Sequence, residues 1–205
     1  MGRVLTQRRT VRADSRNVVR GEQTRQRILQ AARARILVES FEAMRLDDLA
    51  SDVGVTKAAV IKSVGGKASM LLLLGEEDRL TRLEVIRDAM ALRSGLRRRL
   101  TDVVRRLLEL DASRLNVVAA YVGYMWFWTG ADHDRSHAMV EDTRSRLCEL
   151  IADASPVPVP PARQRILSLR LVAAYAIGIR ELHFRKCPLE DTVRLVIDMT
   201  MDPSG

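Results

Sequence analysis

The chain has 205 residues, of which 47% are apolar and 29% charged, with a formal net charge of +8 and a pI of about 10.3. This balance excludes a disordered or fibrous chain and favours a helical protein that is long enough to bury a core. Residues 1–70 hold 14 Lys and Arg against 7 Asp and Glu, whereas residues 71–205 are nearly neutral. The basic excess therefore predicts an anionic partner for the first third, with nucleic acid ahead of a membrane surface.

The first 22 residues contain six arginines and hardly any apolar periodicity. This pattern predicts a flexible basic arm over residues 1–22. Such an arm could enter a DNA minor groove, or it could touch nothing. The arginines are Arg3, Arg8, Arg9, Arg12, Arg16 and Arg20.

From Thr24 onwards the apolar residues recur at helical spacing, and no alternating strand pattern is present. We therefore expect an all-α fold of about nine helices. The ranges are 24 to about 40, 46–53, 57–63, 67–92, 96–111, 114–128, 133–153, 161–186 and 189–201. The stretch PVPVPP at 156–161 predicts an extended connector, because proline runs cannot continue a helix.

The segment 46–64, LDDLASDVGVTKAAVIKSV, has the spacing of a helix-turn-helix. Ala50 is small enough for two helices to cross closely, and Gly54 can adopt the left-handed backbone of a tight turn. Thr56 can cap the second helix, which such a motif presents to a major groove. The alternative is an ordinary helical corner with a glycine turn, but the local basicity favours DNA binding.

The stretch from Thr24 to Leu74 resembles the N-terminal DNA-binding domain of TetR-family transcriptional regulators. The resemblance depends on an ordered set of features. These are Thr-Arg-x-x-Ile-Leu, an Ala-rich first helix, Phe41, Leu49-Ala50, Gly54-Val55, Thr56 and Lys67. It implies a three-helix helix-turn-helix domain at 23–70 and a larger helical ligand-binding and dimerisation domain at 71–205.

The chain departs from the family pattern at several positions. Ile61 stands where the family usually has a tyrosine whose hydroxyl contacts a phosphate, and isoleucine cannot make that bond. Ser63 and Val64 replace residues that are usually aromatic, Arg45 replaces a Ser or Thr cap, and Ser40 replaces a glycine. We expect Ile61 to pack in the core.

The candidate DNA-binding residues follow from their places in the motif. Lys57 and Lys62 project about 140° apart on a helix, so one can face bases while the other faces the backbone. Alanine methyl groups can contact thymine methyl groups, and a lysine at a helix start lies where phosphates bind. The full set is Arg45, Thr56, Lys57, Ala58, Ala59, Lys62 and Lys67. Each lysine could instead be merely solvated.

Five of the eight aromatic residues lie in AYVGYMWFW at 120–128. Such a cluster can line an effector pocket, or it can fill the core or a dimer interface. The candidate ligand-binding residues are Tyr121, Tyr124, Met125, Phe127, Trp128 and His137. This part also faintly resembles the choline-responsive repressors of betaine synthesis, which would imply a cationic effector held by aromatic faces.

His133 and His137 stand four residues apart beside Asp132 and Asp134, a spacing that can hold a metal on a helix face. A polar helix start explains the same residues more simply, so we predict no metal and no cofactor. His183 lies on an apolar helix, where histidine is more often a core residue than a ligand. No nucleophile elbow, phosphate loop or Cys/His metal pattern is present, so we do not expect an enzyme.

The segment 166–179, ILSLRLVAAYAIGI, is apolar nearly all round and must bury two sides. One side can pack on the chain's own core and the other on a second copy, with Ala174 and Ile177 at the contact. The result is a homodimer that presents two recognition helices to a palindromic operator. The family resemblance implies the same assembly, with a small-molecule effector that releases double-stranded DNA.

Two further observations concern the compartment. Cys148 and Cys187 are too few for a disulfide framework, which indicates a reducing environment. The start of the chain lacks the apolar core of a signal peptide, and the longest apolar run, Val117–Trp128, is too short to span a bilayer. We expect a cytoplasmic regulator without a membrane partner. The alternatives are a helical ligand-binding or partner-binding protein with a degenerate helix-turn-helix, and a membrane-surface binder.

Overall fold

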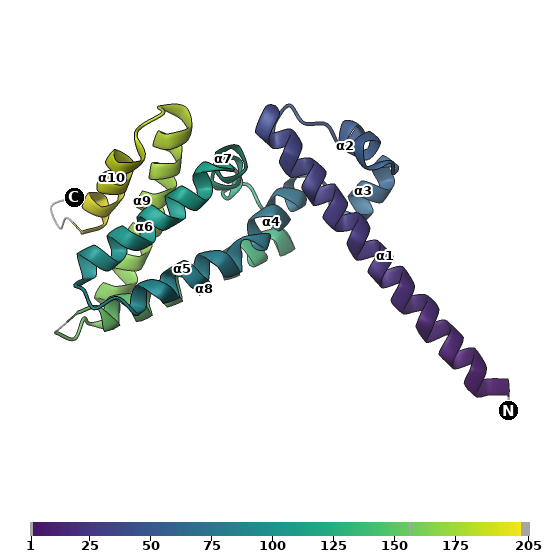
Figure 1. The fold of residues 1–205 in the computed structure, drawn as a ribbon, viewed down its shortest axis with the longest axis horizontal. Helices are drawn as coiled ribbons and strands as arrows, with labels where there is room; N and C mark the ends of the chain where they lie inside the picture. The colour runs from purple at the N-terminus through teal and green to yellow at the C-terminus, as the bar shows by residue number, and fades with distance from the viewer. Residues whose placement is uncertain (1, 156, 202–205) are drawn as a thin grey trace. The chain divides into compact units, whose positions relative to one another are not determined.

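The computed structural model describes residues 2–155 and 157–201, with side chains from residue 18 onwards. These residues form ten α-helices and no strand, which confirms the all-α prediction. The helices are α1 (Gly2–Val38), α2 (Leu46–Val53), α3 (Lys57–Val64), α4 (Lys67–Glu77), α5 (Arg79–Met90), α6 (Leu96–Ala112), α7 (Leu115–Tyr124), α8 (Gly130–Asp153), α9 (Pro161–Phe184) and α10 (Leu189–Met201) (Figure 1).

The chain divides into two compact units, residues 1–73 and 74–205. In the first unit the C-terminal half of α1 packs against α2 and α3 (Figure 1). Its core contains Ile28 and Ile36 from α1, Leu49 from α2 and Val60 from α3, none of which is exposed to solvent. Burial of these large aliphatic side chains, each worth about 1.5–3 kcal/mol, stabilises the three short helices as one body.

Gly54 and Gly65 of this unit end their helices as the sequence predicts. Gly54 follows α2 at φ 71° and ψ 40°, in the left-handed region. The amide of Val55 then donates to the carbonyl of Ala50 at 2.9 Å, which satisfies a free carbonyl at the end of the helix. Gly65 ends α3 in the same way at φ 76°. Local backbone chemistry therefore sets the length of the recognition helix.

The first helix is longer than its sequence pattern predicts. The pattern begins at Thr24, but α1 begins at Gly2. Arginine and glutamine are good helix formers, and no proline interrupts this segment, so the packed part of α1 can propagate towards the N-terminus. The side chains of Arg3, Arg8, Arg9, Arg12 and Arg16 lie outside the described residues. The role of the basic arm and the three-part division of the chain stay predictions.

The second unit is a helical bundle in which α9 packs on α7, α8 and α10, and α6 packs on α5 and α10. The predicted helix at 67–92 is divided at Asp78 into α4 and α5, which is why ten helices are seen instead of about nine in the described part of the chain. Gly178 brings α9 and α10 together, since a Cβ at this position would lie 2.7 Å from Cγ2 of Val196. The small residue thus serves packing within the chain.

Among the described residues, no single helix is long and apolar enough to cross a membrane. Two helical segments, Lys57–Val64 and Lys67–Met90, have the length and composition of a membrane span only when they are taken together. A bend of 50° separates them.

Candidate nucleic-acid interface

The helix-turn-helix of α2 and α3 presents one face of α3 to solvent. Val60 and Val64 are buried in the core of the first unit, so their side of α3 faces the protein interior. Lys57, Ala58 and Lys62 are exposed on the rest of the helix. The hydroxyl oxygen of Thr56 accepts from the amide of Ala59 at 3.2 Å, which confirms the predicted N-cap. This exposed face is short and cationic, and it also carries Ile61 and the small side chain of Ala58.

Lys57 lies at the start of this face and pairs with Asp47 of α2, with 2.9 Å between its Nζ and the carboxylate Oδ2. The hydrogen bond from Lys57 lowers the pKa of Asp47. Both side chains are exposed, and such pairs contribute about 0–1 kcal/mol. A phosphate could therefore displace the carboxylate at little cost.

Lys67 opens α4, and it is the most constrained of the three lysines in the motif. Its Nζ donates to the carbonyl of Glu42 at 2.8 Å and lies 4.9 Å from the ring centroid of Phe41. The ammonium group thus joins the loop after α1 to the start of α4. Because lysine has three donors, two remain for a phosphate, so Lys67 can combine a structural and a binding role.

Arg45 is exposed and precedes α2 as its N-cap, but its side chain makes no capping hydrogen bond. Lys62 forms no ion pair or hydrogen bond with a described residue. It lines an open groove together with Ala59 and Ser63 of α3 and residues of α1. Lys57 and Lys62 thus have different surroundings, and which of them faces bases stays a prediction.

The prediction that Ile61 packs in the core is wrong. Ile61 is 44% exposed, because the rotation of α3 is set by Val60 and Val64 and turns position 61 outwards. An exposed isoleucine on this face can contact an apolar group of DNA, such as the thymine methyl. The buried position of Val64 agrees with a packing role for that residue.

Two arginines of α1 that the sequence reasoning missed position the motif. Arg27 donates from Nη2 to the carbonyl of Val53 at 2.8 Å and so satisfies a free carbonyl at the end of α2. Arg35 binds Asp52 of α2 through both Nε and Nη2, at 2.5 and 3.0 Å. This hydrogen bonding lowers the pKa of Asp52. Their spacing of eight residues, two helical turns on one face of α1, was the only signal in the sequence.

The predicted effector residues of the second unit form an aromatic cluster that is partly open to solvent. The ring centroids of Tyr121 and Tyr124 lie 5.0 and 6.1 Å from that of Trp128. Trp128 is 4% exposed, whereas Phe127 is 71% exposed. Tyr121 also packs closely on Gly75, because a Cβ atom added to Gly75 would lie only 2.5 Å from the ring of Tyr121. Burial raises the pKa of Tyr121, so its hydroxyl stays protonated as a donor.

The other two candidates of this set are more exposed than a binding pocket requires. Met125 follows α7 and is half-buried, and His137 is exposed on α8. The rings of His133 and His137 stack, with 6.1 Å between their centroids. No group of three or more His, Cys, Asp or Glu side chains that could hold a metal ion occurs in the part of the chain that the structure describes. The assignment of effector residues stays a prediction.

The core of the second unit holds a charged cluster that sequence reasoning did not predict. Asp111 of α6 is fully buried and accepts from Nη2 of Arg82 at 2.5 Å and from the hydroxyl of Tyr175 at 2.7 Å. Burial and the Asp111 charge raise the pKa of Tyr175 well above its ordinary value. Burial lowers the pKa of the Arg82 guanidinium, whereas the negative charge of Asp111 raises it. The effect of Asp111 is the larger, so the pKa of Arg82 is raised. The cluster ties α5, α6 and α9 together.

One side of α9 is buried and the other is exposed, as its apolar sequence predicts. One of the two residues predicted at the dimer contact, however, needs a correction. Ala174 is 2% exposed and packs in the chain's own core, so it is not part of an outer face. Ile177 is 40% exposed and lies on the other side. The outer face of α9 also contains Ile166, Leu169 and Phe184, and Leu195 and Met199 are exposed on α10.

No protein-family model matches the chain, and no curated protein matches it significantly. Several solved structures share its fold. A TetR-family transcriptional regulator from Streptomyces coelicolor is 20% identical, with a TM-score of 0.60 over 87% of this chain and 79% of that one. The regulator FadR from Bacillus subtilis, in complex with stearoyl-CoA, is 12% identical, with a TM-score of 0.67 over 86% and 97%.

A third structure, the TetR-family regulator PfmR from Thermus thermophilus, is 13% identical, with a TM-score of 0.63 over 87% of this chain and 99% of that one. All three likenesses extend over both compact units, and not only over the helix-turn-helix. They do not single out the choline-responsive repressors. The chain therefore has the fold of TetR-family transcriptional regulators, with an N-terminal helix-turn-helix and a helical C-terminal unit.

Proposed function

We propose that the chain is a DNA-binding transcriptional regulator that acts as a ligand-responsive repressor and binds a palindromic operator as a homodimer. The observation that carries this proposal is the exposed face of α3. It is capped by Thr56, held by Val60 and Val64, and carries Lys57 and Lys62. A helix presented in this way suits a major groove, where its small side chains permit close approach and its cations meet phosphates.

The outer face of α9 and α10 supports the homodimer. Large apolar side chains such as Ile177 and Phe184 are exposed there, although the opposite side of α9 is buried in the core. An apolar helix face of this kind is characteristic of an interface. A second copy of the chain would cover it with the same face, because two-fold interfaces are isologous.

Helix α4 supports the coupling between effector and operator. The division between the two units falls after Leu73, within α4, so a single helix belongs to both. An effector in the second unit can change the orientation of this helix and thereby the spacing of the two recognition helices. The coupling free energy expected for such a regulator is about 1–3 kcal/mol.

Two classes of effector are worth testing first. FadR from Bacillus subtilis, which shares this fold, is seen with stearoyl-CoA, so long-chain acyl-CoA is one class. The aromatic cluster around Trp128 suits a quaternary ammonium group, which is the second. Addition of either class to the protein–DNA complex, followed by measurement of operator affinity, tests the proposed response.

Selection of bound sequences from genomic fragments tests the function as a whole. The expected result is enrichment of a two-fold symmetric site whose half-site spacing reports the dimer. A protein in which Lys57 and Lys62 are both alanine should enrich no such site. Failure of the unmodified protein to enrich any sequence would favour the second candidate, a helical ligand-binding or partner-binding protein, for which the exposed aliphatic side chain of Ile61 is the supporting observation.

A further inference from the structure

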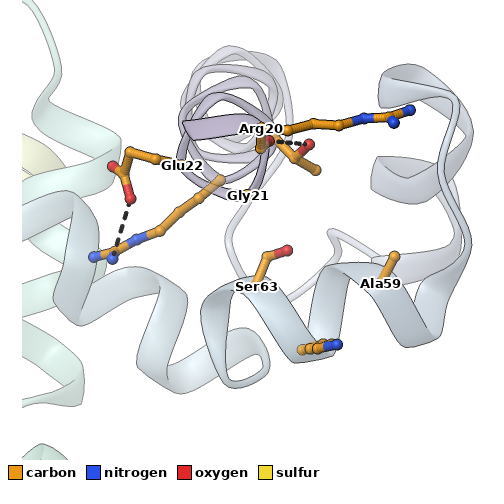
Figure 2. A pocket seen from close by; sticks show the side chains of 8 residues that line it. Arg20, Gly21, Glu22, Ala59 and Ser63 are labelled. Carbon is orange, nitrogen blue, oxygen red and sulfur yellow. Dashed lines mark hydrogen bonds and ion pairs between the residues drawn. The ribbon is translucent and has the colours of Figure 1, made fainter. Parts of the chain in front are cut away.

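An open groove of about 460 Å³ lies between α1 and α3, beside the face that would read bases. Its α1 side is formed by residues 20–25 and its α3 side by Ala59, Lys62 and Ser63. Figure 2 shows Ala59 and Ser63 projecting from α3 towards α1, with Arg20 reaching out from α1. These small side chains and Gly21, which has no side chain, leave the groove open.

The groove is rich in hydrogen-bond donors that lack partners among the described side chains. Arg20 and Lys62 are exposed, and their charged ends form no ion pair or hydrogen bond with a described side chain. The Nε of Arg25 is buried and has no hydrogen-bond partner in the part of the chain that the structure describes. The terminal nitrogens of Arg25, whose side chain is 37% exposed, are the atoms that an acceptor on a ligand can reach.

The charge of the groove indicates what that acceptor is. Three of its lining side chains are cationic, and the only carboxylate among them is that of Glu22. Glu22 lies 3.8 Å from a terminal nitrogen of Arg25, which partly neutralises it (Figure 2). The site is therefore built for an anion with several oxygen atoms, and a phosphodiester group fits this description.

The position of the groove favours a DNA phosphate over a free anion. Ala59, Lys62 and Ser63 belong to the same helix as the base-reading residues Ala58 and Ile61, so a backbone that passes α3 must pass the groove. On α3 itself, Lys57 already pairs with Asp47. Arg20 and Arg25 of α1 add two positive charges to those of Lys57 and Lys62 on α3.

We propose that this groove lies against the operator backbone, and that Arg20, Arg25 and Lys62 contact its phosphates. The inference deepens the proposed function and rests on it. It assigns a DNA-binding role to α1 at residues 20–25, a segment that the helix-turn-helix motif does not include. The site would clamp the recognition helix to the backbone at its inner edge and so fix its depth in the major groove.

The first test measures how the operator affinity depends on salt. For the unmodified protein, log K should fall steeply with log salt, and Arg20→Gln should reduce the steepness of that slope by about 0.9 if one phosphate contact is lost. Arg25→Gln should do the same. Arg93→Gln is the matched control, because it removes one exposed positive charge in the second unit, and it should leave the slope unchanged. Circular dichroism and melting temperature establish that each variant is folded.

The second test locates the phosphate. In a set of operators, each has one phosphate replaced by an uncharged methylphosphonate. At one position this replacement should weaken binding by the unmodified protein but not binding by Arg20→Gln. Slopes and methylphosphonate effects that are the same for the unmodified protein and both groove variants would overturn the groove assignment and leave the proposed function intact. Absence of DNA binding by the unmodified protein would instead contradict the proposed function, and the groove assignment with it.

Discussion

The residue whose position most changes the interpretation of the recognition helix is Ile61. A buried isoleucine would only support α3, but this side chain is 44% exposed next to Ala58 and Lys62. Apolar side chains in a major groove can distinguish thymine by its C5-methyl group. We therefore expect Ile61 to contribute to sequence choice and not only to affinity.

Replacement of a contacted thymine by deoxyuridine, which lacks only the methyl group, tests this role of Ile61. The change should weaken binding by the unmodified protein by about 0.8 kcal/mol, the value of one buried methyl-sized group, or roughly fourfold. Binding by Ile61→Ala should be insensitive to the same replacement. Val38→Ala, which truncates an exposed valine at the end of α1, is the control. Equal sensitivity of the unmodified protein and Ile61→Ala at every thymine would exclude the contact.

At the scale of elements, the contact between α1 and α2 depends on charge. Arg35 holds Asp52 by two hydrogen bonds and lowers its pKa from the ordinary value of 3.8. Because the pKa in the folded state is lower than in the unfolded state, the ion pair stabilises the fold above that ordinary value. This contribution is lost as the pH falls below 3.8 through the pKa of the folded state.

Urea denaturation between pH 2 and pH 7 measures this contribution. Asp52→Asn should lower the free energy of unfolding at pH 7 and should lose less stability than the unmodified protein as the pH falls below about 4. Asp48→Asn, in the same helix but without an ion pair to a described residue, should keep the pH dependence of the unmodified protein. Parallel pH profiles for the unmodified protein and Asp52→Asn would show that the pair contributes nothing in solution.

In the second unit, the buried carboxylate of Asp111 joins three helices through Arg82 and Tyr175. Asp111→Ala should lower the free energy of unfolding by about 3–5 kcal/mol, because it removes the shared partner of Arg82, Arg114 and the Tyr175 hydroxyl. Arg82→Met with Asp111→Leu, which removes these two charges and leaves Arg114 paired with Asp78, should recover much of this loss. Chemical denaturation of the two variants checks the expectation, and an equal loss in both would show that packing volume, not charge pairing, is the main term.

At the scale of the whole molecule, the outer face of α9 decides the assembly. Ile177→Glu places a charge on that face and should convert a dimer into a monomer in sedimentation experiments, with the fold retained. Val157→Glu is the matched control, because Val157 is also an exposed aliphatic residue but lies in the connector before α9. A dimer of unchanged stability in Ile177→Glu would place the interface elsewhere. Ala174→Glu is unsuitable for this purpose, since it would disrupt the core.

Several features of the molecule follow from the sequence alone because they depend on local chemistry. Gly54 ends α2 through its left-handed backbone, and Thr56 starts α3 through its hydroxyl, so the limits of the helix-turn-helix could be predicted. The all-α fold follows in the same way from apolar periodicity and the absence of strand patterns. Each of these signals acts over a few residues, and tertiary contacts did not override it.

Other features required the tertiary structure because they depend on how each helix is rotated against its neighbours. The exposure of Ile61, the burial of Ala174 and the meeting of Lys67 with Phe41 are set by side chains far away in the sequence. The groove beside α3 likewise joins residues 20–25 to residues 59–63, which share no local pattern. Composition and spacing therefore determined the fold class, whereas packing decided which individual residues are exposed.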